Sequence, residues 1–455
     1  MSSPTTTISS IVARQIYDSR GHPTIECDLT DSAGRVHRGV SPSGASTGIL
    51  EALELRDGGS AHHGKGVLKA VANVNGVLAP ALLGRDVRDQ RGADELMTRV
   101  LDGSSSIEAG WCKSKLGANA ILAVSMALCR AGAAAAGVPL YAYIAGLAGR
   151  PAGGVTLPVP FINVINGGEH SGAPIVFQEF MLAPIGAGSF AEAMQMSSET
   201  FHHLRALIKA KWGVGALGAG DEGGFAPDVS SPEEALDLLV AAIERAGYTG
   251  RIKIAMDVAA SEFATEDAPP RYDLGKKLRA RGAADTLGSR SGEEMVELYA
   301  ALAAKYPLVS LEDPFDQMDA PRWVAVTARL APAPLQVVAD DSTVTNILRV
   351  RRAIDERWAT CLLTKVNQIG TITESIDAVL MAQAAGWSAM VSHRSGETED
   401  CFIADLAVGL DCGQIKSGAP CRAERTAKYN QLLRIEAALG ARAKFAGADF
   451  AKKLW

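Results

Sequence analysis

Short apolar segments that each end in a charged or polar residue recur through the second half of this chain, and they constrain the fold more than any other feature. They are RIKIAMD, PLVSLED, LQVVADD, CLLTKVNQ, SAMVSHRSGE and GQIKSG, which lead to Asp257, Glu312, Asp340, Lys365, His393 and Lys416. Successive ends lie 23 to 28 residues apart, except for a first interval of 55. A strand, a helix and two loops need about that many residues, and the first interval has room for two such units. The spacing therefore predicts repeated βα units, most simply a (β/α)8 barrel.

The N-terminal part of the chain has a different pattern. Residues 8–30 alternate apolar and polar around the turn signal Ser-Arg-Gly-His-Pro, which is typical of a β-hairpin. A Ser/Gly-rich loop at 41–48 and helical patterns to about 145 follow, and residues 146–160 form a Gly/Pro-rich linker. We therefore expect an α/β protein with an N-terminal α+β domain at 1–146 and a barrel domain at 147–455.

Composition excludes several classes of protein. With 47% apolar residues and a net charge of −6, the chain lacks the basic character of a nucleic-acid binder and a cationic face for a membrane surface. Its seven cysteines include no CxxC pair, which points to free thiols in a reducing compartment, and we expect a cytoplasmic protein. The N-terminus has no secretory signal, although a short organelle transit peptide stays open. Residues 131–149 carry no charge, but we expect a buried helix at 115–137 and a turn rather than a membrane span.

Three of the strand ends are carboxylates: Asp257, Glu312 and Asp340. In a parallel barrel the carboxyl ends of the strands meet around one mouth, where charged residues are typical of a catalytic site. Hard oxygen ligands without Cys or His favour magnesium over zinc, and a cation would relieve the repulsion between the acids. The alternative is that each acid forms a separate salt bridge with a neighbouring Lys or Arg.

Basic residues end the next strands. Lys365 or Lys416, close to another cation and a metal, would have a lowered pKa and could act as a base, or both could simply neutralise the carboxylates. The segment HRSGETED places His393, Arg394 and Ser395 on one turn, and a guanidinium with a hydroxyl would suit a phosphate.

Two glycine-flanked segments add candidates for acid catalysis. GDEGG holds Glu222, INGGEH holds His170, and Glu179 follows shortly after. If Glu222 and Glu179 lie close together, like-charge repulsion raises the pKa of one, which could then protonate a leaving hydroxyl. The loop at 41–48 could close over the site and offer hydroxyls to a second metal. Together these residues suggest removal of a proton next to a carboxylate, a reaction that needs a strong cation field, a base and an acid.

These motifs resemble the enolase family in order and over nearly the whole chain. The matching segments are DSRG, SGASTG, KSKLGANAILAVS, QEFM, GDEGGFAP, SLEDPF, ADDSTVTN, KVNQIGT, SHRSGETED and GQIKSGAP. The resemblance implies a barrel whose first units are irregular, and a cytosolic homodimer with no nucleic-acid or membrane partner. It also implies the reversible dehydration of 2-phospho-D-glycerate, a small phosphorylated three-carbon acid, to phosphoenolpyruvate. The reaction would pass through an enolate stabilised by two Mg²⁺ ions.

The resemblance also implies roles for individual residues. Lys365 matches the base that takes the C2 proton, and Glu222 matches the acid that acts on the C3 hydroxyl, with support from Glu179. Metal ligation matches four residues, three acids for the tighter Mg²⁺ and a lid serine for the second: Asp257, Glu312, Asp340 and Ser46. Contacts to the substrate match Arg394 and Ser395 for the phosphate, Lys416 for the carboxylate, and the pocket histidines His170 and His393.

Some features depart from the family pattern. The link at 101–115 is longer than usual, and Pro174 stands in a loop that is expected to move. Neither removes a chemical group. Two other functions stay open at this point: an aldolase-like barrel with Lys365 as a Schiff-base nucleophile, and a non-catalytic binding protein on the same fold.

Overall fold

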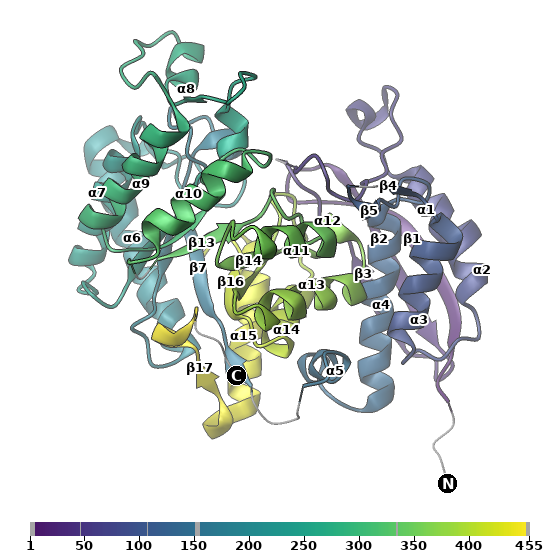
Figure 1. Ribbon diagram of the computed structural model, residues 1–455. Helices are drawn as coiled ribbons and strands as arrows, with labels where there is room; N and C mark the ends of the chain where they lie inside the picture. Colours follow the sequence, from purple (N-terminus) through teal and green to yellow (C-terminus); the bar gives the residue numbers. More distant parts are fainter. Residues whose placement is uncertain (1–4, 46, 107, 151–154, 334, 452–455) are drawn as a thin grey trace.

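The protein has two lobes, an N-terminal α+β lobe and a larger barrel lobe (Figure 1). The structure is a computed structural model that describes residues 5–45, 47–106, 108–150, 155–333 and 335–451. Buried or half-buried ion pairs join the lobes, among them Arg130 to Asp400 at 2.8 Å and Lys113 to Glu374 at 3.0 Å. Lys113 lies in the longer link at 101–115, so this link ties the N-terminal lobe to the barrel.

The N-terminal lobe is a three-stranded antiparallel sheet covered by helices. Strands β1 (Ile8–Tyr17) and β2 (Pro23–Asp31) form the predicted hairpin, and β3 (Val36–Val40) adds a third strand that the sequence did not predict. The sequence VHRGV lacks an apolar face, since three of its five residues are not buried. The helices are α1 (Leu68–Asn73), α2 (Ala79–Leu82), α3 (Gln90–Glu95), α4 (Ala118–Ala136) and α5 (Leu140–Leu147), and the link contains the short pair β4 (Ser105–Ser106) and β5 (Gly110–Trp111).

Helix α4 is the uncharged segment that is close to membrane-spanning length. Among the described residues it is the one helix that is long and apolar enough to cross a membrane, but 83% of its apolar window is buried inside the protein. It packs against β2 and β3, ends at Gly137 in the left-handed conformation, and is followed by Pro139. The predicted buried helix and turn are confirmed.

Eight strands of the second lobe form a closed barrel. Around the barrel the order is β12-β13-β14-β15-β16-β7-β8-β9, with β9 next to β12. Strand β8 runs antiparallel to both neighbours and the other pairs are parallel, so the predicted fold class, with its irregular first units, is confirmed. The strands are β7 (Val159–Asn166), β8 (Glu179–Ala183), β9 (Lys253–Asp257), β12 (Leu308–Glu312), β13 (Gln336–Ala339), β14 (Cys361–Thr364), β15 (Ser388–Ser392) and β16 (Gly413–Lys416).

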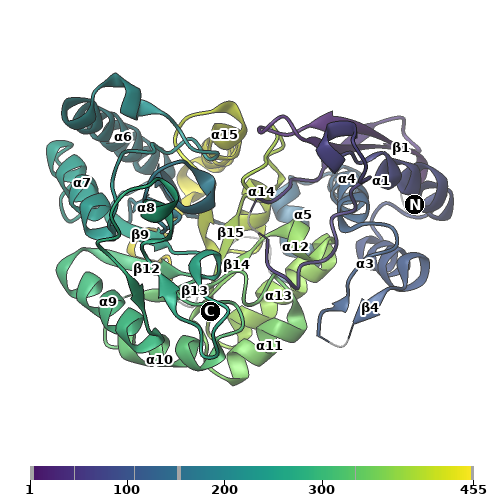
Figure 2. The same ribbon diagram turned by 90° about the horizontal axis from the view of Figure 1, so that it is seen from above.

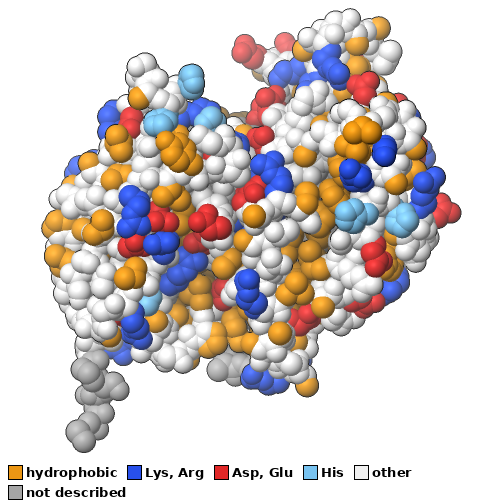
Figure 3. Space-filling model, turned by 180° about the vertical axis from the view of Figure 1, so that it is seen from behind, with side chains coloured by type: hydrophobic (Ala, Val, Ile, Leu, Met, Phe, Trp, Pro, Cys, Tyr) orange, Lys and Arg blue, Asp and Glu red, His pale blue; other side chains and the backbone are white. Residues whose placement is uncertain are grey.

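Helices surround the barrel (Figure 2). Four of them begin with the pattern Ser/Thr-x-x-Glu, in which Ser189, Ser231, Ser291 or Thr371 accepts a hydrogen bond from the backbone N–H three residues later. The helices are α6 (Phe190–Trp212), α7 (Pro232–Arg245), α9 (Gly292–Lys305), α10 (Ala320–Leu330), α11 (Ile347–Asp355), α12 (Val366–Ile369), α13 (Ile372–Ala384), α14 (Phe402–Gly409) and α15 (Ala423–Leu439). On the face seen from behind, acidic and basic side chains are interspersed (Figure 3).

The prediction of two βα units in the 55-residue interval is wrong. Strand β9 pairs directly with β12, and before α9 the intervening chain makes an excursion of β10 (Tyr272–Asp273), α8 (Lys276–Ala280) and β11 (Ser289–Arg290). The segment EDAPPRYDLGKKLRARGAADTLGSR is too polar to supply a strand that is buried on both faces.

The barrel interior is uncharged at one end, where buried Gln and Ser side chains bond one another, and charged at the other. Phe161 of β7 and Phe450 pack edge to face within a cluster of small and apolar strand residues. That end is also covered by a short parallel pair, β6 (Thr156–Leu157) with β17 (Lys444–Phe445). With one end filled, only the opposite mouth is left for polar chemistry.

Candidate active site

The strand-end residues predicted from the sequence gather at this mouth. Asp257, Glu312 and Lys416 are the last residues of β9, β12 and β16. Asp340, Lys365 and His393 directly follow β13, β14 and β15. Glu179 reaches the same rim from the other direction, because β8 is reversed and its first residue lies opposite Asp257.

A small cavity at the mouth collects most of the predicted catalytic and substrate-binding side chains. It is lined by His170, Gln178, Glu179, Glu222, Lys365, Ser392, His393, Arg394, Ser395 and Lys416. The residues predicted to handle protons and those predicted to bind anions therefore face one space.

Lys416 contacts three carboxylates at the mouth, those of Asp257, Glu312 and Glu179, which we call the acidic wall. Its Nζ atom lies 2.8 Å from Glu312, 3.0 Å from Asp257 and 3.2 Å from Glu179, and all four side chains are buried. Burial opposes the charge on Lys416, but the three carboxylates outweigh it and raise the pKa of the lysine well above its usual value. Lys416 is therefore a permanent cation.

Lys365 has a closer partner than the sequence indicated. Its Nζ atom is ion-paired with Asp340, whose other carboxylate oxygen accepts a hydrogen bond from Gln368 at 2.7 Å. Burial favours the neutral amine, but Asp340 outweighs it and raises the pKa of Lys365 above its usual value. The shift is therefore opposite to the expected lowering, because the nearest charge is the anion of Asp340.

The predicted metal ligands are paired with lysines, Asp257 and Glu312 with Lys416, and Asp340 with Lys365. Among the described residues, the groups that bring three candidate ligand atoms within 4.8 Å of one another are Asp313, Asp340 and Asp341, and His170, Glu179 and Glu222, rather than the predicted set. Lys416 lies between Asp257 and Glu312, which gives the separate salt bridges that the sequence left as the alternative. Buried anions take the nearest cation when no metal neutralises them.

The acidic wall nevertheless fits a hard cation. One oxygen of Glu312 is buried without a hydrogen-bond partner among the described residues, and so is one oxygen of Glu179. Asp313 accepts backbone hydrogen bonds from Asp340 and Asp341, both at 2.9 Å, and so holds the Asp340 backbone in place. The donors are carboxylate oxygens, the ligands that Mg²⁺ prefers.

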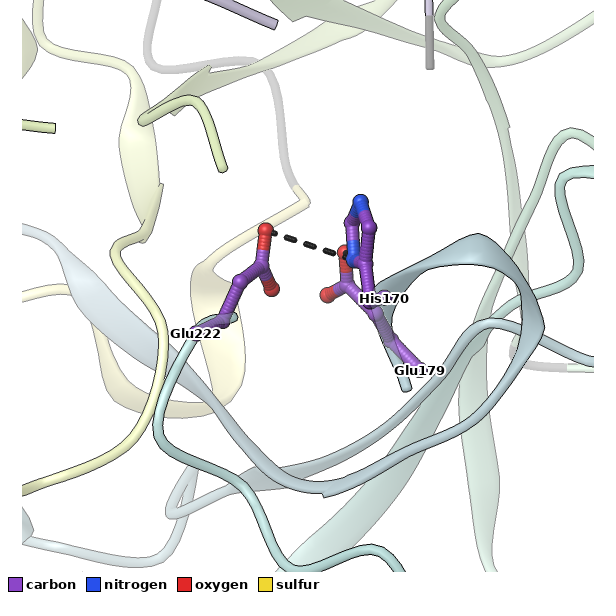
Figure 4. A group of neighbouring side chains, drawn as sticks. All are labelled: His170, Glu179 and Glu222. Atoms are coloured by element: carbon purple, nitrogen blue, oxygen red, sulfur yellow. Dashed lines mark ion pairs between the residues drawn. The ribbon is translucent and has the colours of Figure 1, made fainter. Parts of the chain in front are cut away.

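A second group at the mouth combines two histidines with two glutamates, and Glu179 belongs both to this group and to the acidic wall. Glu222 lies 3.5 Å from Nδ1 of His170, which is 3.8 Å from Glu179, and all three side chains point toward one another (Figure 4). The other oxygen of Glu222 accepts a hydrogen bond from Asn163 at 2.9 Å. His393 approaches Glu222 from β15, with Nε2 at 3.4 Å.

The two glutamates differ in proton affinity. Burial raises the pKa of Glu179 well above its usual value, and the negative charge of Glu222 adds to this effect. Burial would also raise the pKa of Glu222, but His393 and His170 hold it well below its usual value. The sequence predicted that one of the pair would be raised. In the substrate-free protein that residue is Glu179, whereas Glu222 was the expected acid.

The predicted phosphate ligands lie beside the loop at 41–48. Arg394 donates to Glu51 at 3.0 Å, and Ser43 exchanges backbone hydrogen bonds with Gly396, both at 2.9 Å. A Cβ atom on Gly44 would lie 1.7 Å from the guanidinium of Arg394, so the loop can approach this closely only because a glycine stands there. Ser46, the predicted ligand of a second metal, lies outside the described residues.

Sequence reasoning missed several residues at the mouth. Asn163 lies within the apolar run VPFINVI of its strand, and a polar residue inside a buried strand could have marked it as a candidate site residue. Glu51 and Arg425 gave no such signal, because each lies in a helical or loop pattern where a charged residue is ordinary. Their contacts with Arg394 and His393 arise only from the three-dimensional arrangement.

Comparison with known proteins agrees with this geometry. The family model described as "Enolase, N-terminal domain" matches residues 8–144, and "Enolase, C-terminal TIM barrel domain" matches residues 154–454. An enolase of Solanum lycopersicum is 57% identical over 446 residues, which cover 98% of each chain. "Enolase 2" of Hevea brasiliensis is 56% identical over 98% of each chain, and an enolase of Eimeria tenella is 57% identical over 97% of this chain and 98% of its own.

The chain belongs to the enolase family. It is therefore a lyase of the phosphopyruvate hydratase type, as the sequence predicted. This assignment replaces the two alternative functions, an aldolase-like enzyme and a non-catalytic binding protein. Enolases use metal ions, and the acidic groups at the mouth of this barrel are suited to hold them.

Proposed function

We propose that this enolase catalyses the reversible dehydration of 2-phospho-D-glycerate to phosphoenolpyruvate in its barrel mouth, with Mg²⁺ as the metal. One observation carries the proposal. The cavity at the mouth is lined by two lysines, two glutamates and two histidines. The reaction removes a proton from C2 and a hydroxide from C3, so it needs a base and an acid that face the substrate from different sides.

Lys365 is the proposed base. It projects from the end of β14 into the cavity, and its position is fixed by the ion pair with Asp340. To accept the C2 proton its amine must first be neutral, which requires the pull of Asp340 to be offset. A second cation bound to Asp340 would do this, since nearby positive charge lowers the pKa of an amine.

Glu222 is the proposed acid, with Glu179 as its proton-holding neighbour. Glu179 keeps a proton because of burial and the adjacent negative charge, whereas Glu222 is stabilised as the anion. His170 lies within 3.8 Å of both carboxyl groups and can connect them. A proton held by this group can thus be delivered to a leaving hydroxyl at the Glu222 side of the cavity.

The substrate carries two anionic groups, and the cavity offers two places for them. Arg394 and Ser395 suit the phosphate, because a guanidinium binds oxyanions with two parallel hydrogen bonds. Lys416 suits the carboxylate, because it is a buried cation that lines the cavity. The phosphate must displace Glu51 from Arg394, and the segment that carries Glu51 follows the loop at 41–48.

Magnesium would be held by oxygens of Asp257, Glu312 and Asp340, with a second ion near Ser46. When bound, it supplies positive charge that stabilises the negative charge developing on the substrate carboxylate. The orphaned oxygen of Glu312 and the all-oxygen donor set support this assignment. We further propose a cytoplasmic homodimer, which would have no membrane or nucleic-acid partner.

The test is a direct assay of the purified chain. We expect absorbance of phosphoenolpyruvate to grow after 2-phosphoglycerate is added with Mg²⁺, and to stop growing when the metal is chelated and return when Mg²⁺ is restored. An enzyme that folds normally but shows no metal-dependent growth would contradict the proposal. Calcium added at the same concentration tests the preference for the smaller cation.

A further inference from the structure

The imidazole of His393 lies between a permanent cation and a carboxylate. Its Nδ1 atom is 2.7 Å from Nη1 of Arg425, and its Nε2 atom is 3.4 Å from Oε1 of Glu222. His393 follows β15 and Arg425 lies in the first turn of α15, the helix that follows the neighbouring strand β16, so the contact joins two adjacent units of the barrel. Both side chains are buried, which keeps water from competing for either ring nitrogen.

The chemistry of the two side chains decides where the ring proton lies. A guanidinium has only N–H donors, carries no acceptor, and stays protonated in proteins. A neutral imidazole has one N–H group and one nitrogen lone pair. The nitrogen that faces Arg425 must therefore be the acceptor. We propose that Arg425 is a positioning residue that fixes His393 as the Nε2–H tautomer, which places the ring proton on the nitrogen nearer to Glu222.

Arg425 is itself held in one orientation. Nη1 also donates to the carbonyl of Arg394, and Nη2 donates to the carbonyls of Ser395 and Asp221, the last at 3.0 Å. These carbonyls belong to the two segments that carry the phosphate ligands and Glu222. The guanidinium therefore cannot turn away from His393 without breaking the contacts that shape the mouth.

The tautomer matters because the ring is neutral. Burial lowers the pKa of His393 to about 4, so the ring carries one proton near neutral pH. As the Nε2–H form it presents a donor to Glu222, next to the donor from Asn163 at 2.9 Å. The opposite tautomer would place a lone pair against the carboxylate at 3.4 Å, and the two would repel. Arg425 thus acts on Glu222 through His393.

Nuclear magnetic resonance of the substrate-free protein tests the tautomer directly. With ¹⁵N-labelled histidine, His393 is assigned by the signals lost in His393→Gln. We expect its Nδ1 signal in the region of an unprotonated ring nitrogen and its Nε2 signal in that of a protonated one. The reverse pattern in the wild-type protein overturns the proposal, and this measurement needs no variant that alters Arg425.

Matched variants test the role of Arg425. Arg425→Met removes the donor, whereas Arg425→Lys keeps a side chain that can only donate. Arg422→Met is the control, because Arg422 also donates to loop carbonyls, of Gly220 at 3.1 Å and Ser19 at 3.3 Å, with no contact to His393 among those that the structure records. We expect Arg425→Met to change the ring signals and to lower kcat by about 10- to 100-fold with little change in KM. Arg425→Lys should restore both, and Arg422→Met should leave the ring signals unchanged.

The kinetic part rests on the proposed function, and the spectroscopic part does not. A folded Arg425→Met protein with unchanged His393 signals contradicts the proposal. If that variant does not fold, the wild-type spectrum and Arg425→Lys still decide it. A wild-type protein with the expected tautomer but no turnover of 2-phosphoglycerate would refute the function and leave the tautomer assignment standing.

Discussion

The two walls of the barrel mouth hold their charges in different ways. In the cation-paired half, each basic residue contacts an acid: Lys365 with Asp340, Lys416 with Asp257 and Glu312, and Arg394 with Glu51. In the histidine half, the carboxyl groups of Glu179 and Glu222 face His170 and His393, and Glu179 also lies 3.2 Å from Lys416, where the two halves meet. One wall is a set of fixed ion pairs, and the other is a set of groups that share protons.

The difference shows in proton affinity. Ion pairing raises the pKa of Lys365 and Lys416, so both stay charged across the physiological range. In the histidine half, burial lowers the pKa of both histidines, and the pKa values of the two glutamates move apart. Where the environment moves the pKa values of two neighbouring groups apart, one group can act as an acid and the other as a base in the same site. Four experiments test whether the two halves differ in this way.

The largest effect is expected from Lys365→Ala. Removing the proposed base should lower turnover by about 10³- to 10⁴-fold and abolish exchange of the C2 proton with solvent. The measurement is isotope exchange followed by mass spectrometry, beside the turnover assay. Lys305→Ala is the control, because Lys305 is an exposed lysine of α9. Exchange that survives in Lys365→Ala would place the base in the other half.

Glu222→Gln should separate the two halves of the reaction. We expect dehydration to fall by about 10²- to 10³-fold, because the acid is lost, whereas exchange of the C2 proton continues at the intact lysine wall. Glu169→Gln provides the comparison, since Glu169 is exposed and lies one residue before His170. Parallel loss of exchange and dehydration would show that the walls do not act separately.

The free energy of unfolding should also depend on pH through the histidine half, and not through the lysines of the cation-paired half. The pKa of His393 is lowered from 6.5 to about 4, so the folded state favours the neutral ring. Its stabilising contribution is present above pH 6.5 and is lost as the pH falls toward 4. Relative to His393→Gln, the wild-type protein should lose up to about 3 kcal/mol of unfolding free energy over this window.

Denaturant titrations from pH 7 to pH 4 measure this difference. Lys305→Met is the control and should show no such window, because this exposed lysine of α9 is charged in both the folded and the unfolded state there. A constant difference between wild type and His393→Gln would contradict the lowered pKa.

The smallest effect is expected at the edge of the cation-paired half. Glu51→Gln removes the charge that competes with a phosphate for Arg394. We expect KM for 2-phosphoglycerate to fall about fivefold, which corresponds to about 1 kcal/mol. Steady-state kinetics measure it. A higher KM would mean that Glu51 holds Arg394 in its binding position rather than blocking it.

The strand ends could be predicted from the sequence because burial on both faces leaves a clear signal. A run such as LQVVADD changes from apolar to charged where the strand leaves the barrel, and Asp340 lies at that point. The 55-residue interval misled the count because spacing alone does not separate a buried strand from a polar excursion. The third strand of the N-terminal sheet was missed for the related reason that β3 buries little.

Partners within the site could not be predicted in the same way. The pairing of Lys365 with Asp340, or of Arg425 with His393, depends on which side chains of neighbouring units meet at the mouth, over 25 and 32 positions of sequence. Sequence spacing fixes which rim a residue reaches but not its neighbours there. The direction of the Lys365 pKa shift therefore differed from expectation, although its place in the site did not.

The reversal of β8 has a consequence for how the site is assembled. Because β7 arrives at the rim and β8 departs from it, the connecting hairpin stays at the mouth and carries both His170 and Glu179. Two catalytic groups are thus carried by one short connection between neighbouring strands, without an outer helix between them. A deformation of that hairpin shifts both groups in concert, so their mutual geometry is buffered against changes elsewhere in the scaffold.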